Sequence, residues 1–239
     1  MKQYGKTCVK TYEVPIGLDF ETISLKTLPI NKTPLYGFIG EEDSGKNSYV
    51  CYLLDYLIEN RQEAPLKLYL ADETEGYMSK YSQNAEMSIQ SMDDLMSAFS
   101  EIHETLAKRY ALYQKKELDL TKEPLLLLVI NSKNMLKSAS SDKSKAEMYK
   151  DIIGKYRDMK VSILCTDVDN VPILFTAGEL LKNLKDTKSV MFFDDVKNMK
   201  FIEISSLVAK EYKKPIEYSD AYIFSGDRLN KLRTIHKKN

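Results

Sequence analysis

The run "EPLLLLVIN", residues 123–131, places the strongest constraint on the fold of this chain. Its apolar stretch is unbroken, ends in a polar residue, and is far shorter than a membrane span of about 18 residues. Strands with this pattern are buried on both faces, which is typical of the centre of a parallel sheet. Because such a sheet is covered by helices on both sides, the run predicts an α/β fold.

Shorter apolar runs recur along the chain, with segments of helical periodicity between them. Buried strands are predicted at 34–40, 66–72, 161–167 and 189–195, and helices at 46–60, 92–113, about 145–158 and 177–186. The small polar residues of 137–147 predict a flexible loop. We expect a single domain, with opening strands in 1–33, an α/β core in 34–199, and a β-rich closing segment with terminal hairpins in 200–239.

Composition excludes several classes of protein. The 35 basic residues balance the 35 acidic ones, so no overall charge draws the chain to nucleic acid or to a membrane surface. Three scattered cysteines and two histidines suggest neither a disulfide framework nor a Cys/His metal cluster. We therefore expect reduced thiols and a soluble, cytosolic chain that does not bind nucleic acid.

The stretch "FIGEEDSGKNSY", residues 38–49, resembles a phosphate-binding loop of the pattern G-x-x-x-x-G-K-[ST]. It follows a predicted strand and opens a predicted helix, which is the context such a loop requires. Asn47 replaces the hydroxyl residue that would bind Mg²⁺, and Ser48 carries a hydroxyl one position late. The candidate nucleotide-binding residues are Gly40, Asp43, Ser44, Gly45, Lys46, Asn47 and Ser48.

Charge in this loop has the wrong sign for a polyanion. Backbone N–H groups and Lys46 could still hold phosphates. However, Glu41, Glu42 and Asp43 outnumber that one lysine. A carboxylate about 6 Å from a phosphate costs about 3 kcal/mol at an effective dielectric constant of about 20. Acids that point into solvent would matter much less.

The end of the central strand is altered as well. Active ATPases with such a phosphate-binding loop carry acids at the end of the central strand, which bind Mg²⁺ and activate water. This chain has Asn131 and Ser132 at that place. Loss of a general base typically lowers the rate by about 10²–10⁴. We assign no catalytic residue. Thr166, at another strand end, is a weak candidate for contact with a terminal phosphate.

Three segments together resemble one protein family. "VPIGLDFETISLKTLPINKTPLYGFIGEEDSGKN", "FTAGELLKNLKDTKSVMFFDDVKNMKF" and "SDAYIFSGDRLNKLRTI" are similar to FtsK/SpoIIIE-type ATPase domains. The resemblance is to the last such domain of the type VII secretion motor, the EssC/EccC type. It spans most of the chain, from about Val14 to Ile235.

The resemblance implies a RecA-like P-loop NTPase fold, a three-layer sandwich with a mostly parallel sheet. It implies ATP as ligand, bound weakly or not at all, with Mg²⁺ as a candidate companion. It further implies upstream ATPase domains, hexamers in the full protein, small helical WXG-type substrates, and tethering of this cytoplasmic domain to the membrane through other parts of a longer polypeptide.

Three hypotheses follow. The first is a degenerate, inactive or very weak ATPase that serves assembly and substrate recognition. The second is an active ATP-hydrolysing translocase of the same family. The third is a nucleotide-free scaffold, in which the loop only shapes a turn.

Overall fold

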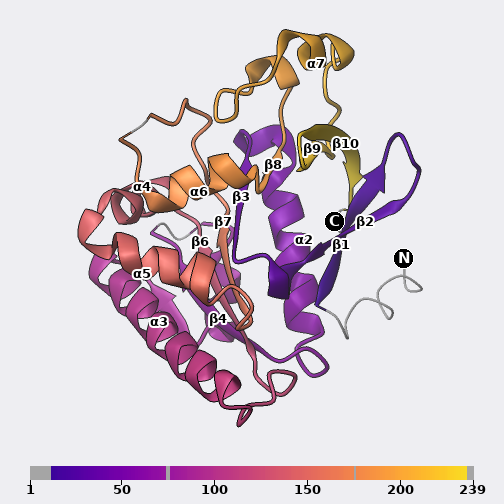
Figure 1. Cartoon of the computed structure of the whole chain (residues 1–239). Coiled ribbons are helices and arrows are strands. Elements are labelled where there is room, and N and C mark those ends of the chain that lie inside the picture. Colours follow the sequence, from indigo (N-terminus) through magenta and orange to yellow (C-terminus); the bar gives the residue numbers. More distant parts are fainter. Residues whose placement is uncertain (1–11, 74–75, 175, 236–239) are drawn as a thin grey trace.

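The computed structural model describes residues 12–73, 76–174 and 176–235, and its centre is one ten-stranded sheet. The strands lie in the order β2-β1-β10-β9-β8-β3-β7-β6-β4-β5 (Figure 1). The bounds are β1 (Glu13–Asp19), β2 (Leu25–Pro29), β3 (Leu35–Ile39), β4 (Leu66–Ala71), β5 (Met87–Ile89), β6 (Leu125–Ile130), β7 (Val161–Cys165), β8 (Val190–Phe192), β9 (Asp220–Ser225) and β10 (Arg228–Thr234). The strands from β8 to β5 are parallel, and the other four extend the sheet in antiparallel pairs.

Helices cover both faces of this sheet. One face packs against α2 (Lys46–Glu59), and the other against α3 (Met92–Gln114), α4 (Lys133–Ser141), α5 (Ala146–Lys150) and α6 (Glu179–Thr187). Along β6, Leu126, Leu128 and Ile130 face the group around α3, while the residues between them face α2. This two-sided burial explains the unbroken apolar run and confirms the predicted three-layer sandwich.

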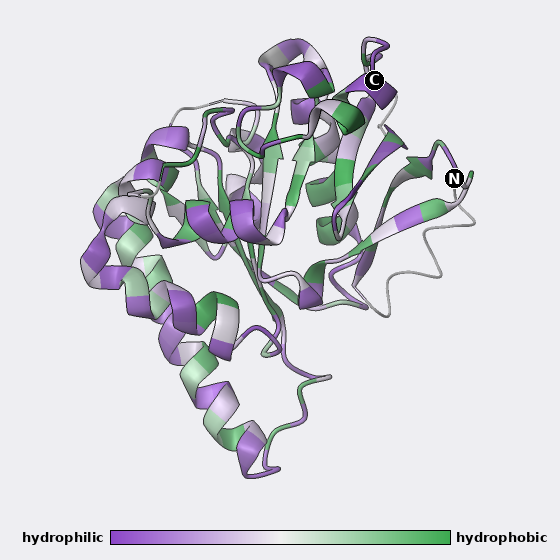
Figure 2. Ribbon diagram, turned by 45° about the horizontal axis from the view of Figure 1, so that its top comes forward, coloured by the Kyte–Doolittle hydropathy of each residue, from purple (hydrophilic) through white to green (hydrophobic). Residues whose placement is uncertain are grey.

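Helix ends follow local sequence signals. Helix α3 begins after Ser91, whose side chain accepts a hydrogen bond from the Asp94 backbone N–H, and Asp93 adds a second acid to the first turn. Along its length, α3 carries both hydrophobic and hydrophilic positions (Figure 2). Its buried residues recur at three- and four-residue steps, as predicted for 92–113.

The prediction of a loop at 137–147 is wrong for most of that segment. Helix α4 runs through Ser141, and Ala146 already begins α5, which continues as a π-helical turn at Asp151–Lys155. Helix α4 forms because Ser132 caps its start and a narrow stripe, Met135, Leu136 and Ala139, is buried. Its exposed face holds the small polar residues that favour loops.

The two ends of the described chain meet in the antiparallel part of the sheet. Gly17 of β1 pairs with Thr234 of β10. The buried Asp19 carboxylate accepts hydrogen bonds from the Thr22 and Glu21 backbone N–H groups and from Asn230 Nδ2. The hydrogen bonds from the Thr22 N–H and, to a smaller extent, from the Glu21 N–H lower the pKa of Asp19 to about 2. Segment 200–235 also contains α7 (Ser206–Glu211).

Cys51 and Cys165 are free thiols, whereas Cys8 lies outside the described residues. Among the described residues, no helix is both long and apolar enough to cross a membrane.

Candidate functional site: a phosphate loop closed by an ion pair

The loop after β3 has the backbone that a phosphate loop needs. It passes through Gly40, turns once at Glu42–Ser44, and reaches Gly45, whose φ of 89° lies in the left-handed region. A Cβ on Gly40 would come within 2.8 Å of both Phe193 Cβ and Ser44 Oγ. Both positions therefore require glycine, Gly45 because of its conformation and Gly40 because of this close approach.

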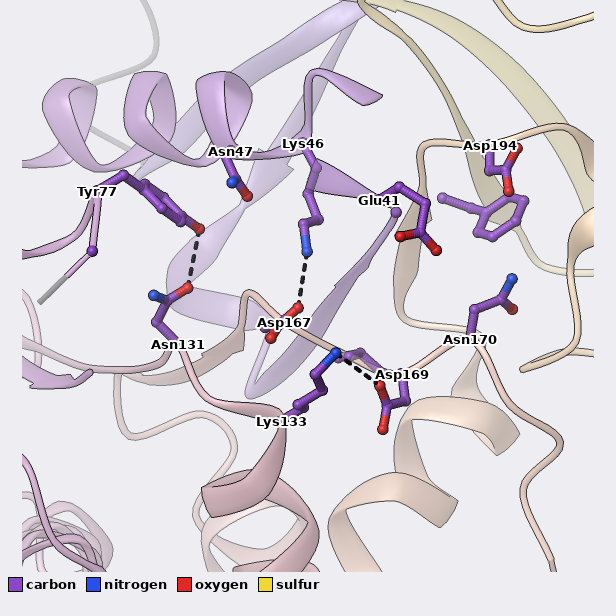
Figure 3. A pocket seen from close by; sticks show the side chains of 14 residues that line it. Glu41, Lys46, Asn47, Tyr77, Asn131, Lys133, Asp167, Asp169, Asn170 and Asp194 are labelled. Atoms are coloured by element: carbon purple, nitrogen blue, oxygen red, sulfur yellow. Dashed lines mark hydrogen bonds and ion pairs between the residues drawn. The ribbon is translucent and has the colours of Figure 1, made fainter. Parts of the chain in front are cut away.

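Lys46, the first residue of α2, is buried, but its ammonium already has a partner. Its Nζ lies 3.1 Å from Oδ1 of Asp167, which follows β7, and the two side chains are 5% and 37% exposed. Figure 3 shows Lys46 pointing from α2 toward the end of β7. A phosphate that approached this lysine would have to compete with a carboxylate that is already in place.

A second lysine of the pocket also has a carboxylate partner, in an ion pair whose side chains are 55% and 46% exposed. Lys133 Nζ, at the start of α4, lies 3.5 Å from Asp169 Oδ1 (Figure 3). Both aspartates come from the segment after β7, so this one segment neutralises both cations of the pocket.

Asn131 lies directly after β6 and uses its whole amide in hydrogen bonds. Its Oδ1 accepts from Tyr77 Oη at 3.0 Å and from Thr166 Oγ1 at 2.7 Å, and its Nδ2 donates to Asp72 Oδ1 at 3.0 Å. Burial raises the pKa of Tyr77, so its hydroxyl stays protonated and acts as a donor. Thr166 therefore serves this network.

Ser132 is also occupied. Its Oγ donates to Glu73 Oε2 at 2.6 Å and accepts from the Met135 N–H, capping α4. Two acids thus lie at the end of the central strand, Asp72 and Glu73, which directly follow the neighbouring strand β4. Asp72 and Glu73 accept hydrogen bonds from Asn131 and Ser132, so Asn131 and Ser132 connect the ends of the two strands.

The remaining loop residues divide between pocket and surface. Asn47 lines the pocket and points into it from α2 (Figure 3). Ser44 Oγ donates to the Glu41 carbonyl, which stabilises the turn. Asp43 is exposed, and neither it nor Ser48 is among the residues that line the pocket.

The cavity has a volume of about 560 Å³ at the carboxyl ends of the parallel strands. It contains four carboxylates, Glu41, Asp167, Asp169 and Asp194, and two lysines, Lys46 and Lys133. Each lysine is paired with one aspartate, so the net charge of the cavity is negative and comes from Glu41 and Asp194. The acidic character expected from the sequence thus extends to acids outside the loop.

The pocket has some of the parts that bind phosphate and lacks, among the residues that the structure describes, a compact group of metal ligands. The glycines, the buried lysine and the helix N-terminus are the parts that bind phosphate. No three His, Cys, Asp or Glu side chains of the described residues lie together as a metal-binding group. Asn47 and Asn131, at the positions where the sequence resemblance leads us to expect a hydroxyl and an acid, offer only amide groups.

Sequence reasoning did not identify Asp167, Asp169, Lys133 or Tyr77 as pocket residues. The polar residues after the run "VSILC" were a signal, because strand ends of a parallel sheet meet at one edge. Asp194, which follows β8, also lines the cavity, whereas Asp195 accepts a hydrogen bond from the Ile216 backbone N–H.

No protein-family model matches the sequence, and no curated protein matches it. Solved structures do match in fold. EssC (ATPases 2 and 3) from Geobacillus thermodenitrificans has a TM-score of 0.73 and 17% identity, over 95% of this chain and 41% of that one. Thermomonospora curvata EccC (ATPases 2 and 3), in complex with a signal sequence peptide, has a TM-score of 0.70 and 13% identity, over 96% of this chain and 41% of that one.

The conjugation coupling protein TcpA of pCW3, in a monomer form with ATPγS, has a TM-score of 0.70 and 16% identity. That match covers 95% of this chain and 66% of TcpA. The chain spans less than half of the EssC and EccC chains that it matches. These comparisons confirm the predicted fold, the RecA-like sandwich of EssC/EccC-type ATPase domains.

Proposed function

We propose that this chain is a degenerate P-loop module of a type VII secretion motor. It holds a nucleotide weakly, hydrolyses it very slowly or not at all, and serves assembly and substrate recognition. The observation that carries this proposal is the ion pair between Lys46 and Asp167, which occupies the cation that a phosphate would need.

A loss of hydrolysis is supported by the strand ends. A general base must lie within hydrogen-bond reach of the attacking water. At the end of β6 that place is taken by the Asn131 amide, which is bonded to Tyr77, Thr166 and Asp72. The acids Asp72 and Glu73 accept hydrogen bonds from Asn131 and Ser132, so they are committed to this network.

Calorimetric titration with Mg-ATP tests the binding half of the proposal. We expect a dissociation constant for ATP well above the micromolar range, and still weaker binding of ATP by Lys46→Ala. A complete absence of binding, in the natural chain and after removal of the Asp167 charge, would favour the scaffold. Steady-state turnover that depends on Lys46 would instead favour the active translocase.

Substrate recognition is supported by a second, largely apolar groove of about 300 Å³. Segment 169–174 and helices α4 and α6 border it, and Val171 and Leu174 beside it are 50% and 69% exposed. An amphipathic helix buries an apolar face of this kind in a groove. We propose that a helical WXG-type substrate docks there, by analogy with the EccC structure that holds a signal sequence peptide.

Fluorescence polarisation with a labelled helical substrate peptide tests this docking. Leu174→Ser is expected to weaken binding about tenfold, the effect of losing one buried leucine contact. Leu207→Ser on α7 is the matched control, because Leu207 is 72% exposed and lies outside the groove. Equal effects of the two substitutions would reject the groove as the docking site.

We further propose that upstream ATPase domains of a longer, membrane-tethered polypeptide flank this module, and that the full protein is hexameric. Mass photometry of the full protein would test the hexamer, with a monomer at working concentrations as the contrary result.

A further inference from the structure

Tyr218 lies close to Gly45 of the phosphate loop. A Cβ placed on Gly45 would lie 3.4 Å from Tyr218 Cε2 and 3.5 Å from its Cζ. Tyr218 as a whole residue is nevertheless 63% exposed. An aromatic ring therefore lies beside the glycine that precedes Lys46, on a residue that is largely accessible to solvent.

The backbone that carries Tyr218 is held firmly by strand β10. Ser219 has a φ of 77°, and its carbonyl accepts hydrogen bonds from both the N–H and the Oγ1 of Thr234, at 2.8 and 2.7 Å. On the other side of Tyr218, Glu217 Oε2 lies 2.7 Å from Arg233 Nη2. A left-handed conformation in a residue other than glycine is costly, and such outliers cluster at ligand sites.

Two ion pairs hold the residue after Ser219 as well. Asp220 is fully buried, and its two oxygens lie 2.6 Å from Arg233 Nε and 2.8 Å from Lys231 Nζ. Tyr218 thus projects from a segment whose position is set on both sides. A ring on a rigid backbone loses little conformational entropy when a ligand covers it.

The sheet order gives the direction in which a nucleotide would lie. Lys46 points toward the ends of β7 and β6, where a terminal phosphate would be. Tyr218 precedes β9, which lies beyond β8 on the opposite side of β3. A nucleotide whose terminal phosphate meets Lys46 would therefore extend its base toward the side on which Tyr218 lies.

We propose that Tyr218 stacks on the base of a nucleoside triphosphate held by the phosphate loop, an inference that rests on the weak nucleotide binding proposed above. Stacking on one aromatic face tolerates every base, because each base presents a π-face. The site would therefore take nucleoside triphosphates as a class and bind ATP and GTP with similar affinity. It would bind inorganic tripolyphosphate more weakly, because that ion has no base.

The test is calorimetry on the full chain carrying Asp167→Asn, with Mg-ATP and Mg-tripolyphosphate as the two ligands. Adding Tyr218→Ala is expected to lower ATP affinity about tenfold, the usual effect of losing one stacked base, and to leave tripolyphosphate affinity unchanged. Tyr218→Phe should retain ATP affinity. Tyr113→Ala, at the far end of α3, is the matched control, since Tyr113 is 47% exposed and borders a separate hollow with Gln114, Lys116 and Leu118.

The outcomes separate this inference from the proposed function. If Tyr218→Ala leaves ATP affinity unchanged, or lowers both ligands equally, the stacking role is rejected and the phosphate site stands. If neither ligand binds the natural chain or the Asp167→Asn chain, weak nucleotide binding is rejected, and the stacking role with it.

Discussion

Replacing Asp167 by asparagine removes the carboxylate that neutralises Lys46 and keeps the size of the side chain. A terminal phosphate would have to approach the same ammonium, whose Nζ lies 3.1 Å from the carboxylate. The phosphate charge would then lie about 5 Å from the Asp167 charge. We therefore expect Asp167→Asn to bind ATP more tightly than the natural chain does.

The size of this gain follows from the separation and the exposure. Two like charges 5 Å apart repel by about 3 kcal/mol at an effective dielectric constant of about 20, and by about 1 kcal/mol in water. Asp167 is 37% exposed, so solvent screens part of this repulsion. A gain of about 1–2 kcal/mol, or about five- to thirtyfold in affinity, is expected.

The free protein should lose stability at the same time. Lys46 is 5% exposed, and without its partner it would be a buried, uncompensated charge. Because its partner is not fully buried, we expect a loss of about 1–2 kcal/mol, below the 3–5 kcal/mol of a fully buried pair. The melting temperature of Asp167→Asn should therefore fall, and saturating ATP should raise it more than in the natural chain.

Calorimetry and thermal unfolding, with and without ATP, measure both effects. In Asp167→Asn, adding Lys46→Ala should erase the gain in affinity. Asp151→Asn is the matched control, because the Asp151 side chain is 36% exposed, pairs with His103 instead, and does not line the pocket. Should folded Asp167→Asn bind ATP no more tightly than the natural chain, the ion pair is not what limits affinity, and the reasoning fails.

Three further predictions concern the strand ends and the fold. Asn131→Asp would place a carboxylate against Asp72, where an amide now donates at 3.0 Å. We expect thermal unfolding to show a loss of about 2 kcal/mol in the free energy of unfolding at pH 7, partly recovered as falling pH protonates the pair. A phosphate-release assay should show no ATP turnover. Asp19, with its pKa lowered to about 2, stabilises the fold above its unfolded value of 3.8. About 1–2 kcal/mol of the free energy of unfolding should be lost between about pH 4 and pH 2. In Asp19→Asn this part of the loss should disappear, and a pH dependence equal to that of the natural chain would contradict the prediction. Gly178→Ala would put a Cβ 1.2 Å from a backbone carbonyl oxygen of α4. Denaturant unfolding should therefore show a loss of about 3 kcal/mol or more in the free energy of unfolding. Gly154→Ala should lose almost none, because its Cβ would have no neighbour within 4 Å.

The core could be predicted because burial on both faces leaves a plain mark in the sequence. The runs at 34–40, 66–72 and 123–131 correspond to β3, β4 and β6 with small differences at their ends. Helix α4 was missed because its buried stripe is narrow and its exposed residues are small and polar. Strand β5 has only three residues, too few for a periodic pattern.

The site could be predicted only in part. The loop was identifiable because its glycines, its lysine and the flanking elements are contiguous in the sequence. The partner of Lys46 is 121 positions away, and the pair depends on β7 lying next to β3. Nothing local to "VSILCTD" specifies that neighbour. Whether Lys46 has an ion-pair partner therefore depends on the order of the strands in the sheet, and the periodicity of the sequence does not encode that order.

The pairing of β1 with β10 has a consequence for biosynthesis. Among the strands of this sheet, β1 and β2 are made before the others, and β10, which hydrogen-bonds to β1, is made last. Until then β1 keeps an unpaired edge, which invites pairing with another chain. Closing so long a loop is slow, because its entropy is lost before the contacts form. We expect nascent chains that stop before Arg228 to depend on chaperones, and aggregation of such chains in a chaperone-free translation mixture would bear this out.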